Sequence, residues 1–338
     1  MEIFLTKIAG QTVVIRNKVS FQRKLQKFVT DGPSKLNVVS DFDYTMSKFT
    51  MDNGERGFSC HRVIEECGLL GSSYESQAMA LQQKYYPIEL DPSIPHDEKV
   101  GHMLAWVTAA HSLLLASNLS QRELKQAVGK AVCDRKLKLR DGVDAFMDQL
   151  AANEVPMLVF SAGIADILEE VLLLETGRTQ PYPNVYVVSN HMVFGEKLVA
   201  DANVAEDTSG TSDEVVKDCL VGFSQPEFHV LNKRAAEVTV EGHSHSSYFR
   251  RPEYITRSNL LLLGDSLGDC LMHRGLHHDD NDIIKIGYLN ARPERLTQFL
   301  DEGHFDIAIL GDPGFHVPLQ ILASVVLKTM SGDLKVFE

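Results

Sequence analysis

The feature that most constrains the fold is a regular alternation of short apolar runs and amphipathic stretches from Gly142 onward. The runs have the length of buried strands, and the stretches between them repeat apolar residues with the period of a helix. Parallel strands are joined by such helical crossovers, so the alternation predicts a parallel sheet with helices on both faces. The expected strands are 156–160, 184–188, 259–263, 283–287 and 305–309, and the expected helices are 142–153, 164–175, 267–275 and 293–301.

An earlier apolar run, Val38-Val39-Ser40, ends in a pair of carboxylates. Asp41 and Asp43 are spaced i and i+2, and in an extended segment alternate side chains point to the same face. Such a pair suits chemistry in which one carboxylate is a nucleophile, the other is an acid, and a divalent cation lies beside them. Alone, this spacing is more typical of a turn, so its meaning depends on the rest of the chain.

Two later runs also end in polar residues. Ser161 follows the strand expected at 156–160 and precedes a helix, where its hydroxyl and the nearby amides favour a phosphate. Asp265 and Asp269 follow Leu263, and their spacing would place both carboxylates on one side of a turn entering a helix, as oxygen ligands for Mg²⁺. Ordinary capping explains each motif by itself. Three such strand ends together favour one shared site at the carboxyl edge of the sheet.

These motifs resemble those of the haloacid dehalogenase superfamily of phosphotransferases, in the order DFDYT, the strand ending in Ser161, Lys233 and GDSLGD. The similarity is closer to the cytosolic 5′-nucleotidases of type three, which include pyrimidine 5′-nucleotidase and the 7-methylguanosine monophosphate nucleotidase. It runs from about Lys35 to the C-terminus and is carried by LQQKYYPIELDP, VFSAGIADILEEVL, VVSN, LNK, LLLGDSLGD and IIKIGYLN. Only this order distinguishes Lys233 from a solvated surface lysine.

The resemblance implies a fold and a mechanism. The fold would be a Rossmann-like parallel sheet core of the haloacid dehalogenase type with an inserted helical cap. The activity would be that of an Mg²⁺-dependent 5′-nucleotidase that forms an aspartyl-phosphate on Asp41, with Asp43 as general acid and base. Mg²⁺ would bind the carboxylates of Asp41 and Asp265 and the backbone carbonyl of Asp43.

The same resemblance implies how phosphate and base are bound. Ser161 and the Ala162 amide would bind phosphate oxygens, and Lys233 would neutralise charge. Asp269 would orient Lys233 or the water shell of the metal. Glu89 matches by position the cap glutamate that contacts the base in the family, and a carboxylate can accept hydrogen bonds from an exocyclic amine or a ring N–H. An exposed carboxylate at a helix end is the alternative for Glu89.

The identity of the base stays open at this stage. Trp106, the only tryptophan, could stack on a base or pack within the cap. Val107 stands where the family often has a second aromatic residue, and Ala110 stands where pyrimidine-specific members tend to have Ser. Ala110 therefore favours the 7-methylguanosine branch, whereas Val107 removes an aromatic that this branch would use. CMP, UMP and 7-methyl-GMP all remain candidate substrates.

Composition limits the partners. The net charge of −13 would repel a nucleic-acid polymer, whereas a single nucleoside monophosphate needs only local positive charge and Mg²⁺. No apolar run approaches the roughly 20 residues of a membrane span, and the N-terminus lacks the pattern of a signal peptide. The five cysteines show no zinc spacing. We therefore expect a cytoplasmic protein, monomeric, with no membrane partner.

The chain divides into three expected parts, because residues after Asp43 show helical periodicity and little strand signal. The acidic, Ser/Thr-rich segment 201–218 predicts a solvated hairpin or loop. The segment 241–245, with two histidines, is expected to be a surface loop more than a metal site. The expected parts are a helical N-terminal lead-in (1–34), an α/β catalytic core (35–55 and 137–338) and a helical cap (56–136).

Two other functions remain as alternatives. A phosphatase for another small phosphomonoester, such as phosphoserine, shares the DFDxT start and the Ser-x-Gly turn, but YYPIELDP and KIGYLN argue against it. A catalytically silent nucleotide-binding module is expected to have lost a catalytic residue, whereas Asp41, Asp43, Lys233 and Asp265 are all present. The sequence therefore favours a phosphoric monoester hydrolase.

Overall fold

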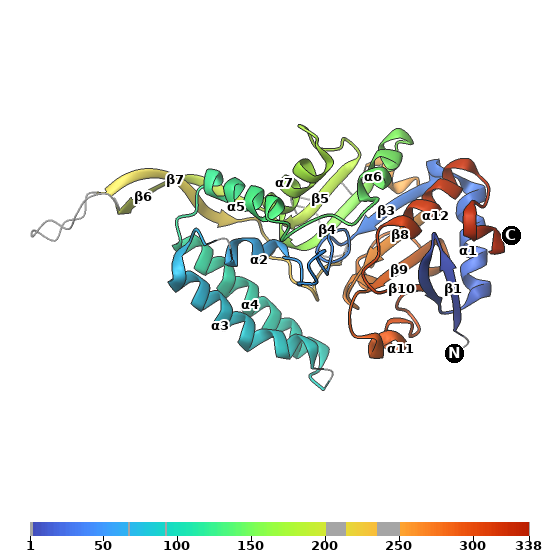
Figure 1. The fold of residues 1–338 in the computed structure, drawn as a ribbon, viewed down its shortest axis with the longest axis horizontal. Helices are drawn as coiled ribbons and strands as arrows, with labels where there is room; N and C mark the ends of the chain where they lie inside the picture. Colours follow the sequence, from blue (N-terminus) through green and yellow to red (C-terminus); the bar gives the residue numbers. More distant parts are fainter. Residues whose placement is uncertain (1–2, 67, 92, 201–213, 235–250, 338) are drawn as a thin grey trace, which may run out of the picture.

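The structure, a computed structural model, describes residues 3–66, 68–91, 93–200, 214–234 and 251–337. Its centre is an eight-stranded sheet in the order β1-β2-β10-β9-β8-β3-β4-β5 (Figure 1). The strands from β10 to β5 run parallel, which confirms the predicted α/β class and all five strands expected after Gly142. The sheet strands are β1 (Phe4–Ile8), β2 (Gln11–Ile15), β3 (Leu36–Ser40), β4 (Met157–Ile164), β5 (Val185–Asn190), β8 (Asn259–Gly264), β9 (Ile283–Leu289) and β10 (Ile307–Leu310).

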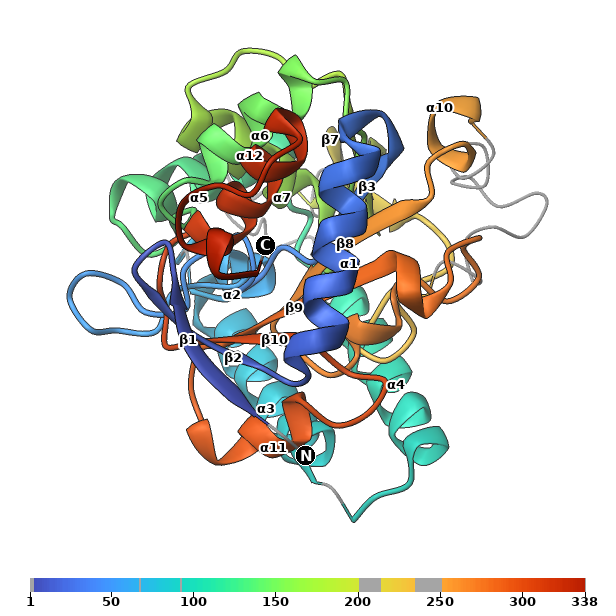
Figure 2. The ribbon, with the colours of Figure 1, turned by 90° about the vertical axis from the view of Figure 1, so that its right-hand side faces the viewer.

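Alternating residues of the central strands bury the two faces of the sheet in two separate apolar clusters. Val38 and Leu261 belong to the cluster that includes α1, α6, α7 and α12, and Val39 and Leu262 belong to the cluster that includes α10 and α11. A strand buried on both faces is typical of a parallel sheet covered by helices, and Figure 2 shows α1 and α12 side by side over one face. These helices are α1 (Lys18–Asp31), α6 (Val143–Ala152), α7 (Ala165–Thr176), α10 (Pro252–Ile255), α11 (Leu296–Phe299) and α12 (His316–Leu327).

The N-terminal residues correct one prediction. The lead-in is not wholly helical, because β1 and β2 form a hairpin whose second strand pairs antiparallel with β10. The hairpin turns through Ala9 and Gly10, both with positive φ (51° and 75°), as in a two-residue type I′ turn. The overlooked signal is the run Val13-Val14-Ile15, whose β-branched side chains suit a strand and are buried here.

Between β3 and β4 the chain leaves the sheet and forms helices; no strand occurs among the residues described from 60 to 133. The helices α3 and α4 lie side by side, and α5 packs near α7 (Figure 1). Within the described ranges, no single helix is both long and apolar enough to cross a membrane, and α4 with α5 meets those limits only as a pair bent by 114°. The four helices are α2 (Cys60–Glu65), α3 (Gly71–Leu90), α4 (His96–Ala116) and α5 (Gln121–Cys133).

A two-stranded antiparallel ribbon extends away from the sheet (Figure 1). It consists of β6 (Met192–Ala200) and β7 (Glu214–Phe223). Residues 214–218 of the acidic segment therefore lie in a strand that pairs with β6, as expected for a hairpin. Residues 201–213 of that segment, and the segment 241–245, lie outside the described residues.

Two expected helices are much shorter than predicted. At Gly268 the chain runs so close to the loop after β7 that a Cβ would lie 2.3 Å from the Val230 carbonyl oxygen. A tertiary contact therefore determines the backbone of the segment after β8, and such a contact cannot be predicted from the spacing of apolar residues. The helix expected at 267–275 is reduced to η2 (Asp269–Leu271), and the one at 293–301 to η4 (Pro293–Arg295) and the single turn of α11.

Candidate active site

The sheet register brings three polar strand ends to one level. In the parallel ladders, Ser40 of β3 is the partner of Val159 in β4 and of Leu263 in β8. The polar residues that lie just beyond these partners therefore meet at the carboxyl edge, where open α/β sheets bind ligands. These residues are Asp41, Ser161 and Asp265.

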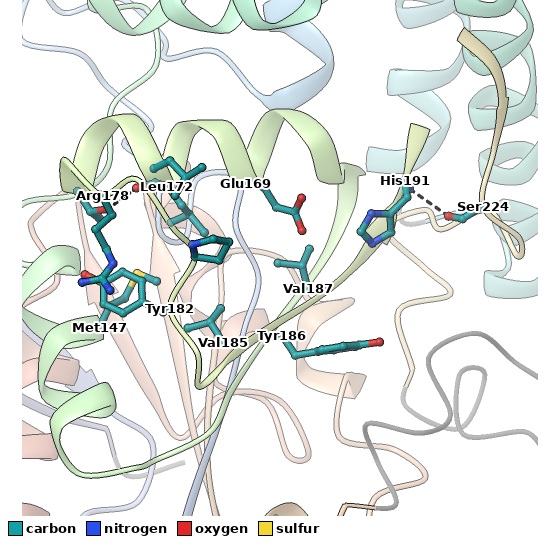
Figure 3. A pocket seen from close by; sticks show the side chains of 13 residues that line it. Met147, Glu169, Leu172, Arg178, Tyr182, Val185, Tyr186, Val187, His191 and Ser224 are labelled. Atoms are coloured by element: carbon teal, nitrogen blue, oxygen red, sulfur yellow. Dashed lines mark hydrogen bonds between the residues drawn. The ribbon is translucent and has the colours of Figure 1, made fainter. Parts of the chain in front are cut away.

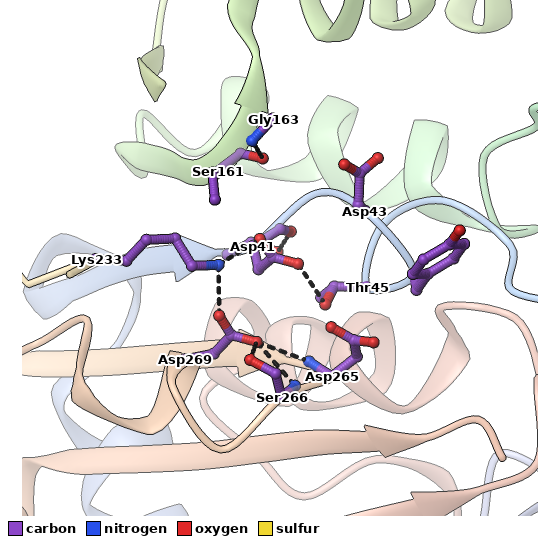
Figure 4. Close-up of polar contacts among 12 residues, drawn as sticks. Asp41, Asp43, Thr45, Ser161, Gly163, Lys233, Asp265, Ser266 and Asp269 are labelled. Atoms are coloured by element: carbon purple, nitrogen blue, oxygen red, sulfur yellow. Dashed lines mark hydrogen bonds and ion pairs between the residues drawn. The ribbon is translucent and has the colours of Figure 1, made fainter. Parts of the chain in front are cut away.

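Lys233 joins them from the loop after β7 (Figure 4). Its Nζ lies 2.7 Å from Asp41 Oδ1 and 2.5 Å from Asp269 Oδ1, and the residue is only 4% exposed. Burial opposes its charge, but Asp269 and Asp41 raise the pKa of Lys233 above its usual range. The site therefore contains a fixed buried cation, unlike the solvated lysine that the local sequence alone would indicate.

The Asp41 carboxylate is held at both oxygens. Oδ1 accepts a hydrogen bond from Lys233, and Oδ2 accepts one from Thr45 Oγ1 at 3.1 Å. The Asp41 amide donates to the Leu263 carbonyl of β8 at 3.0 Å. Burial raises the pKa of Asp41 to about 7, and Lys233 acts against this increase because it stabilises the ionised form. A further cation at this carboxylate would favour ionisation more strongly.

Asp269 is committed to contacts within the protein. Its Oδ2 accepts hydrogen bonds from the amides of Asp265 and Ser266 at 3.1 and 2.9 Å and from the Ser266 hydroxyl at 2.8 Å. Gly264 leaves room for this side chain, since a Cβ there would lie 2.3 Å from Asp269 Cβ. Asp269 thus holds the loop that carries Asp265 and, through its other oxygen, positions Lys233.

The acidic cluster suits a divalent cation. Oxygen atoms of Asp41, Asp265 and Asp269 lie within 4.8 Å of one another. Over the part of the chain that the structure describes, the Asp265 carboxylate has no hydrogen bond or ion pair, and burial followed by the charge of Asp41 raises its pKa well above the usual range. Mg²⁺ prefers oxygen ligands and keeps several waters, so the uncompensated Asp265 and the adjacent Asp41 carboxylate fit such an ion.

Asp43 faces another side of the pocket (Figure 4). Its Oδ1 accepts a hydrogen bond from the Cys60 amide at 2.9 Å, and a Cβ on Gly163 would lie 3.1 Å from its Oδ2. Burial raises the pKa of Asp43 to about 6, although the Cys60 amide lowers it. A carboxyl group with a pKa near neutrality can both give and take a proton, as acid–base catalysis requires. Its carboxylate is directed to Cys60, so the predicted metal contact of Asp43 concerns its backbone carbonyl only.

β4 continues through the predicted turn to Ile164, and its irregular end, where the register with β5 shifts between Phe160 and Ile164, is held by β5. Ser161 is buried, and its Oγ accepts a hydrogen bond from the Gly163 amide at 3.0 Å. Asn190 donates to the Ala162 carbonyl at 2.9 Å, and Ser189 donates to the Gly163 carbonyl at 2.8 Å. Asn190, in the motif VVSN, had no predicted function; it fixes the end of β4 that carries Ser161 and Ala162.

A cavity of about 450 Å³ opens over these residues, which is a size typical of small-molecule sites. Four arginines and Lys233 line it beside five carboxylates, so its lining carries balanced charge although the whole chain has a net charge of −13. The arginines are Arg56, Arg62, Arg292 and Arg295. The predicted site residues that line it are Asp41, Asp43, Glu89, Ser161, Ala162, Lys233 and Asp265.

The helices α3 and α4 form the other wall of the cavity. Glu89 lines it, and burial raises the pKa of this carboxyl group. Trp106 of α4 also lines it and stacks on Tyr85 of α3 with a centroid distance of 6.0 Å, so it both faces the cavity and packs against the neighbouring helix. Val107 and Ala110 line the same wall.

A buried arginine next to the site was not predicted from the sequence. Arg140 is 1% exposed and donates to the carbonyls of Tyr44 at 2.7 Å and Thr45 at 2.8 Å. It also pairs with Asp312 at 2.5 Å. Arg140 therefore holds the loop that follows Asp43, and no local motif indicates this because its partners are distant in the sequence.

A second pocket of about 460 Å³ lies along β5 and α7 (Figure 3). Its exposed lining surface is mostly apolar, although polar residues such as Glu169, Arg178 and His191 contribute to it. It shares no residue with the first cavity and contains none of the predicted site residues. The candidate active site is therefore the cavity over Asp41.

Known proteins resemble this chain over nearly its full length. The family described as pyrimidine 5′-nucleotidase (UMPH-1) matches residues 44–204 and 212–326. The chain is 35% identical to 7-methylguanosine phosphate-specific 5′-nucleotidase A of Xenopus laevis over 325 residues, which cover 96% of this chain and 99% of that protein. It is 31% identical to the 7-methylguanosine phosphate-specific 5′-nucleotidase of Homo sapiens over 325 residues, 96% of each chain.

A solved structure extends the similarity to three dimensions. Cytosolic 5′-nucleotidase IIIB bound to cytidine matches with a TM-score of 0.74 and 29% sequence identity over 94% of both chains. The family match covers well over half of this chain, and the relatives align almost end to end. The chain therefore belongs to the pyrimidine 5′-nucleotidase (UMPH-1) family and is a phosphoric monoester hydrolase of the 5′-nucleotidase type.

Proposed function

We propose that this protein is an Mg²⁺-dependent enzyme that hydrolyses a nucleoside 5′-monophosphate to nucleoside and phosphate. The observation that carries the proposal is the convergence of Asp41, Asp265 and Lys233 at one end of a cavity large enough for a nucleotide. The names of the relatives support 7-methyl-GMP and pyrimidine nucleotides such as CMP and UMP as substrates.

In the first step an Asp41 carboxylate oxygen attacks phosphorus, and the bond from phosphorus to the 5′ oxygen breaks. Asp43 gives its proton to the departing 5′ oxygen, so the nucleoside leaves as an alcohol and Asp41 carries the phosphoryl group. The raised pKa of Asp43 supports this role, because a carboxyl group with a pKa of about 6 is half protonated near pH 6.

In the second step a water molecule attacks the phosphoryl group. The ionised Asp43 takes a proton from this water, the bond between phosphorus and the Asp41 oxygen breaks, and inorganic phosphate is released. Asp43 ends protonated and Asp41 ends as a carboxylate, so both residues return to their starting states.

The carboxylates of Asp41 and Asp265, with the backbone carbonyl of Asp43, are the proposed Mg²⁺ ligands. Bound there, the cation reduces the repulsion between the nucleophile and the phosphate. Lys233 neutralises further negative charge from its position 2.7 Å from Asp41, and Asp269 keeps it there.

Ser161 and the Ala162 amide are the proposed phosphate ligands, at the end of β4 that Asn190 holds. Residues 56–136 serve as a cap domain over the α/β core, and Glu89 contacts the base. Closing a cap over the pocket excludes water other than the one that attacks.

Phosphate release from a panel of phosphomonoesters tests this proposal, with Mg²⁺ and then with EDTA. We expect Mg²⁺-dependent release from CMP, UMP or 7-methyl-GMP and loss of release in EDTA. Turnover of phosphoserine alone would retain the reaction and contradict the nucleotide assignment. Nucleotide binding without release in either condition would contradict the enzymatic proposal as a whole.

A further inference from the structure

Glu227 lies outside every role described so far, yet it joins the cap to the core. It belongs to the loop between β7 and Lys233. Its Oε1 lies 2.7 Å from His111 Nδ1, and its Oε2 accepts a hydrogen bond from Thr108 Oγ1 at 2.6 Å. Thr108 and His111 are one turn apart on α4, so they present their side chains on one side of the helix. One carboxylate therefore binds two residues of the cap.

His111 is well placed to make this contact firm. It is 2% exposed, and its ring stacks on Phe223 with a centroid distance of 3.8 Å. A carboxylate only accepts hydrogen bonds, so His111 donates through Nδ1. Bonds of this kind, with one charged partner, are stronger than those between neutral groups.

The other end of the same loop is fixed to the core. The Glu227 carbonyl accepts a hydrogen bond from Asn232 Nδ2 at 2.9 Å, and Asn232 Oδ1 accepts one from the His229 amide at 2.7 Å. Asn190 binds both the amide and the carbonyl of Phe228. The loop is therefore a short, internally bonded unit that ends at Lys233 beside the proposed nucleophile.

A second contact links this loop to α4 at the opposite end of the helix. Arg234, directly after Lys233, lies 3.0 Å from His96 Nε2 at the first position of α4. The two contacts span fifteen residues of helix, which is roughly 22 Å. The four α4 residues that line the cavity lie between these two contacts: Met103, Trp106, Val107 and Ala110.

From this geometry we infer that Glu227 is a positioning residue that docks α4 on the Lys233 loop, so that the wall facing the nucleoside and the cation facing the phosphate move as one unit. This inference rests on the proposed function, because it assumes a substrate that reaches from Lys233 to α4. It identifies the required substrate as a phosphomonoester with a ring system large enough to touch the cap. A small phosphomonoester such as p-nitrophenyl phosphate would not need the contact.

The test compares Glu227→Ala, Glu227→Gln and the exposed surface control Glu302→Ala. Glutamine can still accept one hydrogen bond and donate to the Thr108 hydroxyl, so it should restore most of the contact. We expect Glu227→Ala to raise KM for the preferred nucleotide about tenfold, the size typical of losing a charge-assisted hydrogen bond, with kcat changed less. Turnover of p-nitrophenyl phosphate should stay within about twofold of wild type, because Lys233 keeps its own partners.

Trp106 provides a readout that is independent of activity, because it is the only tryptophan and lies on α4 in the cavity. Acrylamide should quench its fluorescence more in Glu227→Ala than in wild type, and Glu227→Gln and Glu302→Ala should match wild type. Thr108→Val, which removes one hydrogen bond from an exposed residue, should shift quenching and KM in the same direction by a smaller amount. Thermal melts confirm that each variant is folded.

The inference is overturned if Glu227→Ala leaves either nucleotide KM or Trp106 quenching unchanged. It is also overturned if turnover of nucleotide and of p-nitrophenyl phosphate falls equally, since that pattern indicates a general loss of the Lys233 loop. If wild type hydrolyses p-nitrophenyl phosphate but no nucleotide, the proposed function fails, and the quenching series still tests the docking contact by itself.

Discussion

The two ends of the active-site cavity differ in how firmly the protein holds them. At the phosphate end, Asp41, Lys233 and Asp269 are at most 4% exposed, and Lys233 pairs directly with both carboxylates. At the base end, Trp106 is half-buried, and the Glu89 side chain makes no hydrogen bond to any residue that the structure describes. The phosphate end is built mainly from strand termini of the sheet. The base end is built from helices that lie between β3 and β4 in the sequence.

This difference implies that one region determines the rate of the reaction and the other determines which substrate binds. In the proposed mechanism, the groups of the phosphate end are preorganised for phosphoryl transfer before any ligand binds. The base end has few fixed polar contacts, so in the same proposal its final geometry depends on the position of the helices α3 and α4. Variants of the phosphate end should therefore change kcat for every substrate, whereas variants of the base end should change KM and base preference.

The largest effect is expected for Asp41→Asn. The amide is not a nucleophile at phosphorus, so kcat should fall by about 10⁴-fold or more. Asparagine has nearly the same shape and can still accept a hydrogen bond from Thr45, so the melting temperature should change little. Steady-state phosphate release and a thermal melt check both points. A residual rate within about a hundredfold of wild type would exclude Asp41 as nucleophile.

A smaller loss is expected for Asp43→Asn, and it should depend on the leaving group. Removal of the acid and base should lower kcat for a nucleotide by about 10²–10⁴-fold. p-Nitrophenol leaves without protonation, so the first step with p-nitrophenyl phosphate should persist and give a burst of product in stopped-flow measurements. Equal losses with both substrates and no burst would assign Asp43 another role.

Asp269→Asn sharpens the comparison because Asp269 positions Lys233 without lining the cavity. Loss of a partner that orients a catalytic group typically costs about 10- to 100-fold in activity. We expect this loss in kcat for nucleotide and for p-nitrophenyl phosphate alike. A loss confined to nucleotides would place Asp269 with the base end and break the division between the two regions.

The smallest effect on catalysis is expected for Glu89→Gln at the base end. Replacing the carboxylate should raise KM for the preferred nucleotide by about 10-fold, as for a lost charged hydrogen bond. Turnover of p-nitrophenyl phosphate should remain at the wild-type level. Competition between CMP and 7-methyl-GMP, measured in wild type and variant, reports the change in base preference. An unchanged preference would show that Glu89 does not read the base.

The same comparison explains what the sequence could predict. Asp41, Ser161 and Asp265 follow apolar runs that became neighbouring parallel strands, so local pattern and sheet geometry together bring them to one edge. The positions of Arg140 and Glu227 could not be predicted, because each bonds residues about a hundred positions away. The β1–β2 hairpin was missed because its turn uses Ala9-Gly10 in place of a common turn sequence.

The measurement that tests the central claim most directly is identification of the phosphorylated residue. Asp43→Asn is mixed with p-nitrophenyl phosphate and Mg²⁺, quenched in acid during the burst and analysed by peptide mass spectrometry. We predict a phosphoryl group on Asp41. The double variant Asp41→Asn/Asp43→Asn should carry none. A phosphoryl group on another residue, or a full burst with no phosphorylated protein, would contradict the mechanism.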